Sequence, residues 1–142
     1  MSAPVPAGFE PFTRPSPLMD PWRPLYAKTE ADRIILGVEL REPHTNSRST
    51  AHGGLIAALA DQAMGMSCGV KLRAEGVNVV NLWTASLSID YLGAAKVGQW
   101  LAFDTTFSRV GKTLCHAEID ITADGETMAR GRASFRVSLA KD

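Results

Sequence analysis

The stretch from His44 to Gly69 decides the fold and reads HTNSRSTAHGGLIAALADQAMGMSCG. A polar turn leads into a Gly53-Gly54 step, after which apolar residues recur with helical spacing at positions 55, 58, 59, 63 and 66. The other faces of this segment are also small or apolar, and a helix that is apolar all round is enclosed by other elements. The pattern therefore predicts a buried helix over residues 54–70.

Asp61 is the one residue of this helix that does not fit a plain core. It carries the only formal charge between Arg48 and Lys71. A carboxylate in an apolar environment is costly unless it is paired, hydrogen-bonded or in use. A buried structural carboxylate held by hydroxyls is the alternative to a functional group, and the motif around Asp61 favours function.

The rest of the chain alternates in the manner of β-strands. Strands are expected over residues 25–28, 33–40, 79–92, 99–108, 113–123 and 126–139. Asp124-Gly125 is a strong signal for a two-residue hairpin, and successive hairpins make the sheet antiparallel. The sequence thus predicts an α+β fold, with an antiparallel sheet wrapped around one long central helix. Such a sheet leaves edge strands exposed, which favours pairing with a second subunit.

The first 24 residues differ from the remainder in composition. Seven of the eight prolines lie there, so no regular helix or central strand can run through them. We expect a proline-rich N-terminal arm over residues 1–24, with at most a helical turn at 19–22, and a single folded domain over 25–142. The apolar side chains of the arm indicate that part of it packs on that domain.

Composition narrows the function further. The chain has 142 residues, 45% of them hydrophobic, and a formal net charge of +0. Its Lys and Arg residues are scattered, which argues against a nucleic-acid partner. No apolar run is long enough to cross a membrane, and no signal peptide is evident, so a cytoplasmic protein is expected. Cys68 and Cys115 lack metal-like spacing and are expected to be reduced core thiols. His44 and His116 have no partners at ligand spacing, so no metal site is expected.

The start of the helix indicates a chemistry. Glycines at positions 53 and 54 expose main-chain N–H groups at the positive end of the helix, which suits an oxygen that gains negative charge. Asp61 lies about two turns further along the same face. An oxyanion donor and a base are the minimum for acyl transfer to water. Gly54 and Asp61 are roughly 10 Å apart along the helix, so two helices meeting at a dimer interface are better placed to share one carbonyl.

These residues resemble a known family. The HTN sequence followed by HGGLIAALAD, with Asp61 nine positions after His52, is similar to the hotdog-fold acyl-CoA thioesterases of the PaaI-like, 4-hydroxybenzoyl-CoA thioesterase superfamily. The segments SLSIDYLGAAKVG, SRVGKT and ADGETMARGRASFRV are similar to later strands and turns of the same family. The resemblance covers about residues 25 to 139 and implies the hotdog fold.

The resemblance implies a role for each matching residue. Asp61 would activate water as general base or attack the thioester itself, and Thr84 would orient the water or Asp61. The Gly53 amide would polarise the thioester carbonyl, and Asn46 would help to fix the carbonyl or the water. In this family the Asp and the Ser or Thr come from one subunit, and the Asn and Gly come from its partner. One departure stands out, because relatives usually carry Gly where this chain has Ser49.

Four further residues are candidates for substrate binding. His52 and Gly54 flank the helix start, although His52 can equally be a structural hydrogen-bonding group and the Gly-Gly step can serve tight packing. Arg109 and Lys112 could bind coenzyme A phosphates. Solvated strand ends would explain these two cations equally well.

The sequence is therefore expected to encode an acyl-CoA thioesterase that releases free acid and coenzyme A, with aromatic acyl groups among the candidates. Coenzyme A enters only as part of the substrate, and no metal or redox cofactor is expected. The expected assembly is a homodimer or a dimer of dimers, that is, a homotetramer. A non-catalytic acyl-CoA-binding module is the alternative, and a hotdog hydratase or dehydratase of enoyl thioesters ranks third.

Overall fold

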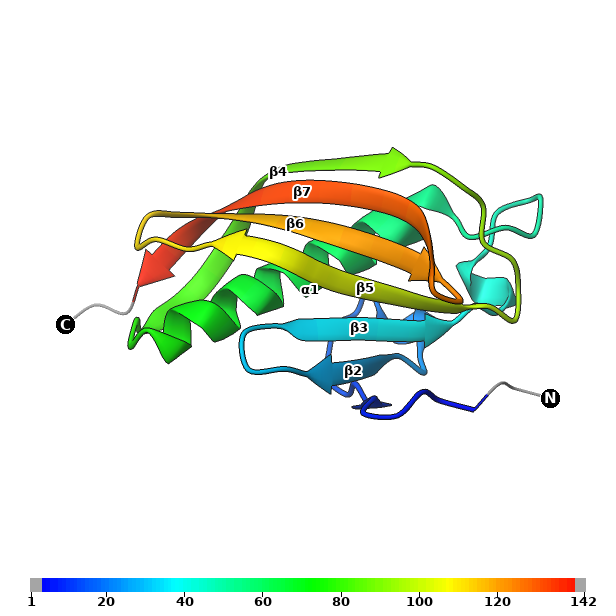
Figure 1. Ribbon diagram of the computed structural model, residues 1–142, viewed down its shortest axis with the longest axis horizontal. Coiled ribbons are helices and arrows are strands. Elements are labelled where there is room, and N and C mark those ends of the chain that lie inside the picture. The colour runs from blue at the N-terminus through cyan, green and yellow to red at the C-terminus, as the bar shows by residue number, and fades with distance from the viewer. Residues whose placement is uncertain (1–3, 140–142) are drawn as a thin grey trace.

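The computed structural model describes residues 4–139, and in it one long helix lies against a curved antiparallel sheet (Figure 1). The sheet has seven strands in the order β1-β2-β3-β5-β6-β7-β4, and every neighbouring pair is antiparallel. The strands are β1 (Glu10–Pro11), β2 (Tyr26–Thr29), β3 (Ile34–Glu39), β4 (Val79–Tyr91), β5 (Trp100–Arg109), β6 (Leu114–Ala123) and β7 (Glu126–Leu139). Two short 3-10 helices, η1 (Asp20–Trp22) and η2 (Glu42–His44), precede the long helix. The predicted α+β fold with one enclosed helix is confirmed.

The helix α1 (Gly53–Ala74) is longer than the pattern predicted. It begins one residue earlier and continues four residues past position 70, because the added turn is made of good helix formers and buries Leu72. The chain leaves the helix at Glu75 and turns at Gly76, whose φ of 79° is left-handed. The predicted end was placed too early because the charged residues Lys71 and Arg73 flank Leu72, although Leu72 continues the buried face of the helix.

The core lies between α1 and the inner face of the sheet. Leu59, Ala63 and Met64 of the helix are fully buried against strand residues such as Phe103 and Phe135. Cys68 on α1 and Cys115 on β6 are free thiols in this core. Burial, together with the neighbouring Cys115, raises the pKa of the Cys68 thiol to about 12. Cys68 is therefore not a nucleophile at neutral pH.

One strand departs from its predicted alternation. In β5, Leu101, Phe103 and Thr105 point inward as expected. Phe107 was predicted on the same face, but its side chain is 48% exposed. The pairing of β5 with β6 shifts register between Asp104 and Phe107, and such an irregularity changes which side chains face the core.

The strand β4 forms one edge of the sheet, and it pairs with β7 on one side only. The Tyr91 hydroxyl donates to the carbonyl of Gly53 on α1, so Tyr91 points to the helix side of the sheet. Leu87 shares that side, since no register shift separates the two residues. Leu87 nevertheless remains 38% exposed and Tyr91 49% exposed, so part of this side of β4 is left uncovered in the single chain.

The N-terminal arm wraps around the opposite edge of the sheet. The arm contains the two-residue strand β1, which the proline content did not predict, and β1 pairs with β2. Phe9 packs edge-on against Trp100, with ring centroids 5.2 Å apart. The helical turn expected at positions 19–22 is present as η1, and Met19 beside it is 3% exposed.

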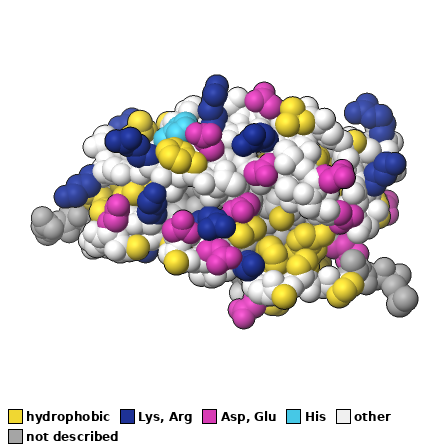
Figure 2. Space-filling view, viewed as in Figure 1, with side chains coloured by type: hydrophobic (Ala, Val, Ile, Leu, Met, Phe, Trp, Pro, Cys, Tyr) yellow, Lys and Arg dark blue, Asp and Glu magenta, His cyan; other side chains and the backbone are white. Residues whose placement is uncertain are grey.

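In the space-filling view, charged side chains of both signs are scattered over the visible face and hydrophobic side chains gather at its lower right (Figure 2).

Candidate active site

Asp61 and Thr84 meet at the centre of the candidate site. Asp61 lies in the third turn of α1, and Thr84 lies on β4 next to a register shift between Thr84 and Ser86. The Thr84 hydroxyl donates to the Asp61 Oδ1 atom at 2.6 Å. A hydrogen bond this short is typical of a hydroxyl bound to an ionised carboxylate. It fixes the carboxylate and leaves Oδ2 available to a water molecule. The two residues that the family resemblance placed together are thus in direct contact.

A cavity of about 310 Å³ opens beside this pair. Its walls come from one face of α1, the first residues of β4 and the N-terminal arm. Gly65 and Gly69 line the cavity without adding side chains that would fill it, and Phe135 also lines it. Asp61 is half-buried at this cavity. The hydrogen bond from Thr84 and the access to the cavity stabilise its carboxylate on an otherwise apolar helix.

The main-chain N–H groups of the two glycines at the start of α1 differ in their partners. His52 is the N-cap residue, and its Nδ1 atom accepts the N–H of Gly54 at 2.9 Å. The N–H of Gly53 has no acceptor among residues 4–139. The two glycines therefore differ: the Gly54 amide is occupied by His52, whereas the Gly53 amide is open to a ligand. The role of Gly54 and His52 in substrate binding stays a prediction.

Asn46 closes the loop that precedes the helix. Its Oδ1 atom accepts three hydrogen bonds, from the N–H of Arg48 at 2.9 Å and from the N–H and hydroxyl of Thr50 at 3.3 and 3.2 Å. Because these donors fix the oxygen, the Nδ2 group faces the other way and is free to donate. Ser49 completes the turn with a φ of 59°, the left-handed conformation for which glycine is the usual choice. The loop thus forms without the glycine that the family usually carries.

Tyr91 is a residue of this region that the sequence did not single out. Its hydroxyl donates to the Gly53 carbonyl at 2.6 Å, and its ring lies close to where a side chain at Gly53 would be. Partial burial raises the pKa of Tyr91, so the hydroxyl stays protonated and remains a donor at neutral pH. The contact ties the end of β4 to the start of α1. The one sequence signal was an apolar side chain at the end of a strand.

His44 is the buried anchor of the same loop. Its side chain is fully buried; Nδ1 accepts the N–H of Arg41 at 2.9 Å, so Nε2 carries the proton and donates to the carbonyl of Trp22 at 2.8 Å. Burial lowers the pKa of His44, and the charge of Arg41 lowers it further, against the opposing effect of the Trp22 carbonyl. His44 is therefore a neutral structural link between the arm and the loop that carries Asn46.

The two halves of the site are separated in one chain. Gly53 and Asp61 are eight residues apart on α1, a rise of about 12 Å. One carbonyl cannot touch both groups, so a single copy holds the carboxylate end and the donor end of a site without bringing them together.

Arg109 and Lys112 line neither of the two cavities that flank α1 in the described part of the chain. Within the described residues no cluster of three or more metal-ligating side chains is present.

Comparison with known proteins assigns this arrangement to a family. The sequence profile of the thioesterase superfamily matches residues 49–129, which include Gly53, Asp61 and Thr84. The chain belongs to the thioesterase superfamily. It is 31% identical over 134 residues to the Pseudomonas aeruginosa protein PA0474, covering 94% of this chain and 97% of that protein. It is 33% identical over 105 residues to mouse acyl-coenzyme A thioesterase 13, covering 71% and 70%.

Solved structures of superfamily members share the fold. A mutant of the phenylacetic acid degradation protein PaaI from Thermus thermophilus superimposes with a TM-score of 0.72 at 18% identity, over 85% of this chain and 98% of that one. A hypothetical thioesterase from Streptococcus pneumoniae, solved with coenzyme A, superimposes with a TM-score of 0.69 at 22% identity, over 83% and 91%. These superpositions confirm the hotdog fold, and the superfamily match together with the thioesterase relative confirms the prediction of a thioester hydrolase.

Across residues 4–139, no helix is both long enough and apolar enough to span a membrane. The expectation of a cytoplasmic location stays a prediction.

Proposed function

We propose that the protein is an acyl-CoA thioesterase that works as a dimer, with Asp61 as the group that initiates hydrolysis. The observation that carries the proposal is the 2.6 Å hydrogen bond from Thr84 to Asp61 at the edge of a cavity on α1. A carboxylate held in one orientation and facing a cavity can take a proton from a water molecule or attack a carbonyl carbon. Membership of the thioesterase superfamily makes the thioester the carbonyl in question.

The hydrolytic step can be written with the residues at hand. A water oxygen bonds to the thioester carbonyl carbon while Asp61 accepts the water proton, and the carbonyl oxygen gains a negative charge. The open Gly53 N–H and the Asn46 Nδ2 group are suited to hold that oxygen. The C–S bond then breaks, and the thiolate of coenzyme A leaves and is protonated. In the alternative route, Asp61 attacks the carbonyl carbon directly and forms a mixed anhydride as the thiolate leaves, and water then hydrolyses the anhydride. The atoms balance in both routes, and the two remain alternatives.

The separation of Gly53 from Asp61 supports two copies per site. The edge strand β4 offers a surface for the second copy, because its outer edge has no partner strand among the described residues and Trp83 is 60% exposed on it. Uncovered apolar side chains along an unpaired edge favour self-association through that edge. In such a dimer, Asp61 and Thr84 of one copy would act with Asn46 and Gly53 of the other.

The hydratase alternative is disfavoured by the positions of the histidines. That chemistry needs a histidine beside the acid, but no histidine of the same copy lines the described walls of the cavity with Asp61, and the His52 ring that the other copy would bring with its Gly53 already serves as the N-cap of the helix. The His52 ring caps Gly54, His44 is bonded to Trp22, and His116 lies on β6 beside Ser134. A non-catalytic acyl-CoA-binding module would have no use for the Thr84–Asp61 pair.

The decisive experiment compares thiol release from a panel of aromatic and straight-chain acyl-CoAs by the wild type, Asp61→Asn and Asp61→Ala. We expect either substitution to lower kcat by about 10²–10⁴-fold or more, since the base or nucleophile is lost. The fold should persist, because Asp61 is half-buried and faces a cavity.

Asp120→Asn is the matched control, because Asp120 also accepts a threonine hydroxyl, that of Thr127 at 3.1 Å, away from the cavity. Its activity should equal that of the wild type. Near-full turnover by Asp61→Ala would rule out the mechanism. Tight binding of acyl-CoA without any release by the wild type would instead identify the binding module.

A further inference from the structure

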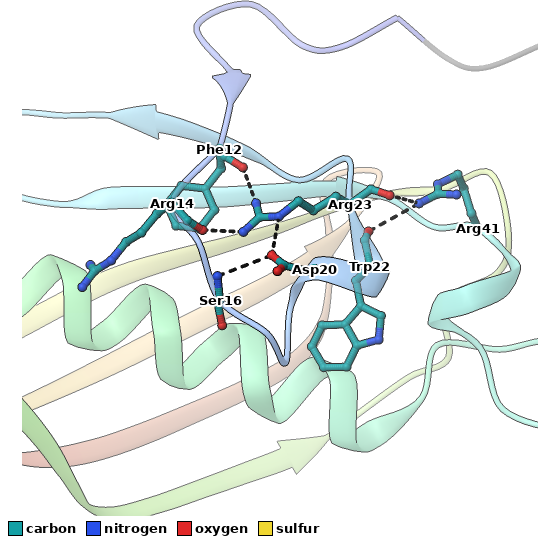
Figure 3. A network of polar contacts seen from close by, with 7 residues as sticks. All are labelled: Phe12, Arg14, Ser16, Asp20, Trp22, Arg23 and Arg41. Atoms are coloured by element: carbon teal, nitrogen blue, oxygen red, sulfur yellow. Dashed lines mark hydrogen bonds and ion pairs between the residues drawn. The ribbon is translucent and has the colours of Figure 1, made fainter.

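The N-terminal arm lines two cavities that lie along α1. Two cavities lie along the helix: one of about 350 Å³ beside Gly54 at the helix start, and the cavity of about 310 Å³ beside Asp61. The arm lines both of them, with Leu18 and Trp22 at the first and Arg14 at the second. In the close-up view the arm runs over α1 and the Arg14 side chain extends along the helix (Figure 3). The arm is therefore part of the site as well as part of the scaffold.

The backbone of Arg14 is held in place by a network of polar contacts. The Arg23 guanidinium donates to the carbonyls of both Phe12 and Arg14, and its Nε atom pairs with Asp20 at 3.0 Å. Arg41 donates to the carbonyl of Arg23 at 2.7 Å, which connects this network to the loop before α1. Figure 3 shows these contacts converging on the turn of the arm. They use the Arg14 carbonyl and leave its guanidinium without a partner among the described residues.

A second cation lies on the far wall of the same cavity. Arg73, near the end of α1, folds its guanidinium back over Gly69, where an added Cβ atom would lie 3.0 Å from Nη1. Gly69 is eight residues after Asp61, so this guanidinium is about 12 Å along the helix from the level of Asp61. Arg73 likewise has no acidic partner within residues 4–139. Asp61 is the only acidic residue lining the cavity in the described part of the chain, and Thr84 already engages it.

We propose that Arg14, together with Arg73, binds an anionic group of the thioester substrate in the Asp61 cavity. The inference deepens the proposed function and rests on it. Two unpaired guanidinium groups at one cavity suit a carboxylate or a phosphate, because each can donate two parallel hydrogen bonds to such an anion. The anion is either a carboxylate at the far end of a short acyl chain or a phosphate of the coenzyme A carrier. Arg14 is thus a specificity-determining residue supplied by the arm.

The test uses acyl groups matched in carbon number. Glutaryl-CoA and pentanoyl-CoA differ only in the terminal carboxylate, and their kcat and KM are measured with the wild type, Arg14→Met, Arg14→Lys and Arg73→Met. Arg130→Met is the control, since Arg130 is an exposed arginine of β7 that does not line this cavity. Loss of a guanidinium–anion contact should lower kcat/KM by about 10- to 100-fold, mainly through KM. Arg14→Lys should recover part of the loss.

The source of the anion follows from the pattern of losses. If the carboxylate of the acyl group is bound, only glutaryl-CoA is affected, and glutaryl-N-acetylcysteamine, which has no phosphate, shows the same loss. If a carrier phosphate is bound, both CoA esters are affected equally and the N-acetylcysteamine esters are unaffected. Unchanged kinetics of Arg14→Met with glutaryl-CoA, pentanoyl-CoA and the glutaryl and pentanoyl esters of N-acetylcysteamine would overturn the proposal.

A binding measurement separates this proposal from the proposed function. Glutarate and coenzyme A are titrated into the wild type and Arg14→Met by calorimetry. If no thioester is hydrolysed but one of these anions binds the wild type at least tenfold more tightly than Arg14→Met, the thioesterase assignment fails and the anion site stands. If thioesters are hydrolysed but Arg14→Met binds and turns over like the wild type, the anion site fails and the thioesterase stands.

Discussion

Individual polar atoms in the loop before α1 have separate tasks. The Asn46 side chain uses its oxygen to hold the loop, and its Nδ2 group has no acceptor among the described residues, so in the proposed mechanism one residue serves structure and ligand binding through different atoms. The His52 ring accepts the Gly54 N–H, whereas the Gly53 N–H has no acceptor among the described residues. Substitutions that alter one atom at a time can separate these tasks.

The variants Asn46→Asp and Asn46→Ala should lose activity to the same extent but differ from each other in stability. The aspartate keeps an oxygen for the N–H groups of Arg48 and Thr50, whereas the alanine loses the three hydrogen bonds. Both variants lack the Nδ2 donor, so kcat should fall by about 10²–10³-fold in each. Thermal unfolding should show a lower Tm for Asn46→Ala than for Asn46→Asp. An unchanged kcat in both would remove Asn46 from the site.

Ser49→Gly should stabilise the protein. The left-handed φ of 59° costs a non-glycine residue about 1–2 kcal/mol, and glycine avoids this cost while losing about 0.5–1 kcal/mol in chain entropy. We therefore expect a gain of up to about 1 kcal/mol, measured by urea unfolding. Ser47→Gly in the same loop is the control, because it has no positive φ to relieve and should be neutral or slightly destabilising. Destabilisation by Ser49→Gly would contradict this account.

At the scale of elements, sequence patterns located the helix and the long strands because these are periodic over many residues. Two features were less predictable: the register shift in β5 that exposes Phe107, and the last turn of α1, in which charged residues flank the buried Leu72. Asp61 and Thr84 could be paired only through the family resemblance, since they are 23 residues apart in sequence. The polar contacts of Tyr91 and Arg14 depend on where β4 and the arm run in space, which spacing does not encode.

The uncovered edge strand β4 leads to a prediction about assembly. Leu87→Glu places a charge on the helix side of β4, where the proposed dimer would bury it, so dimers should dissociate and turnover should be lost together. Sedimentation and thiol release measure the two effects, and circular dichroism checks that the monomer stays folded. Phe107→Glu, a charge at an exposed apolar residue of β5, should change neither. A fully active Leu87→Glu monomer would contradict the shared site.

At the scale of the whole molecule, the arm, the loop before α1 and the helix are joined through His44. This histidine is buried and neutral, and burial places its pKa below the value of 6.5 expected in the unfolded chain. The unfolded state therefore binds a proton more readily than the folded state does. The stabilising effect is complete above about pH 6.5 and is lost as the pH falls from there toward the lower pKa of the folded state.

The free energy of unfolding of the wild type should thus decline below about pH 6.5, by up to about 1.4 kcal/mol per pH unit from this group. His44→Gln should show a shallower decline, although it starts from a lower stability because the bonds to Arg41 and Trp22 are weakened. Denaturant unfolding at pH 5 to 8 measures both curves. His116→Gln is the control, since His116 lies on the sheet surface away from this loop. Parallel curves for wild type and His44→Gln would exclude His44 as the titrating group.

The way in which the arm is attached bears on how this enzyme could evolve. Arg23, Arg41 and His44 attach the arm through main-chain carbonyls, those of Phe12, Arg14, Trp22 and Arg23. Main-chain acceptors persist whichever residue occupies the position, so the side chain at position 14 can vary without loosening the attachment. In the proposed mechanism, the wall that the arm contributes to the cavities is therefore open to drift and selection independently of Asp61 on α1 and Thr84 on β4. One scaffold can diversify its substrates by point mutations in a short proline-rich segment while its chemistry stays unchanged.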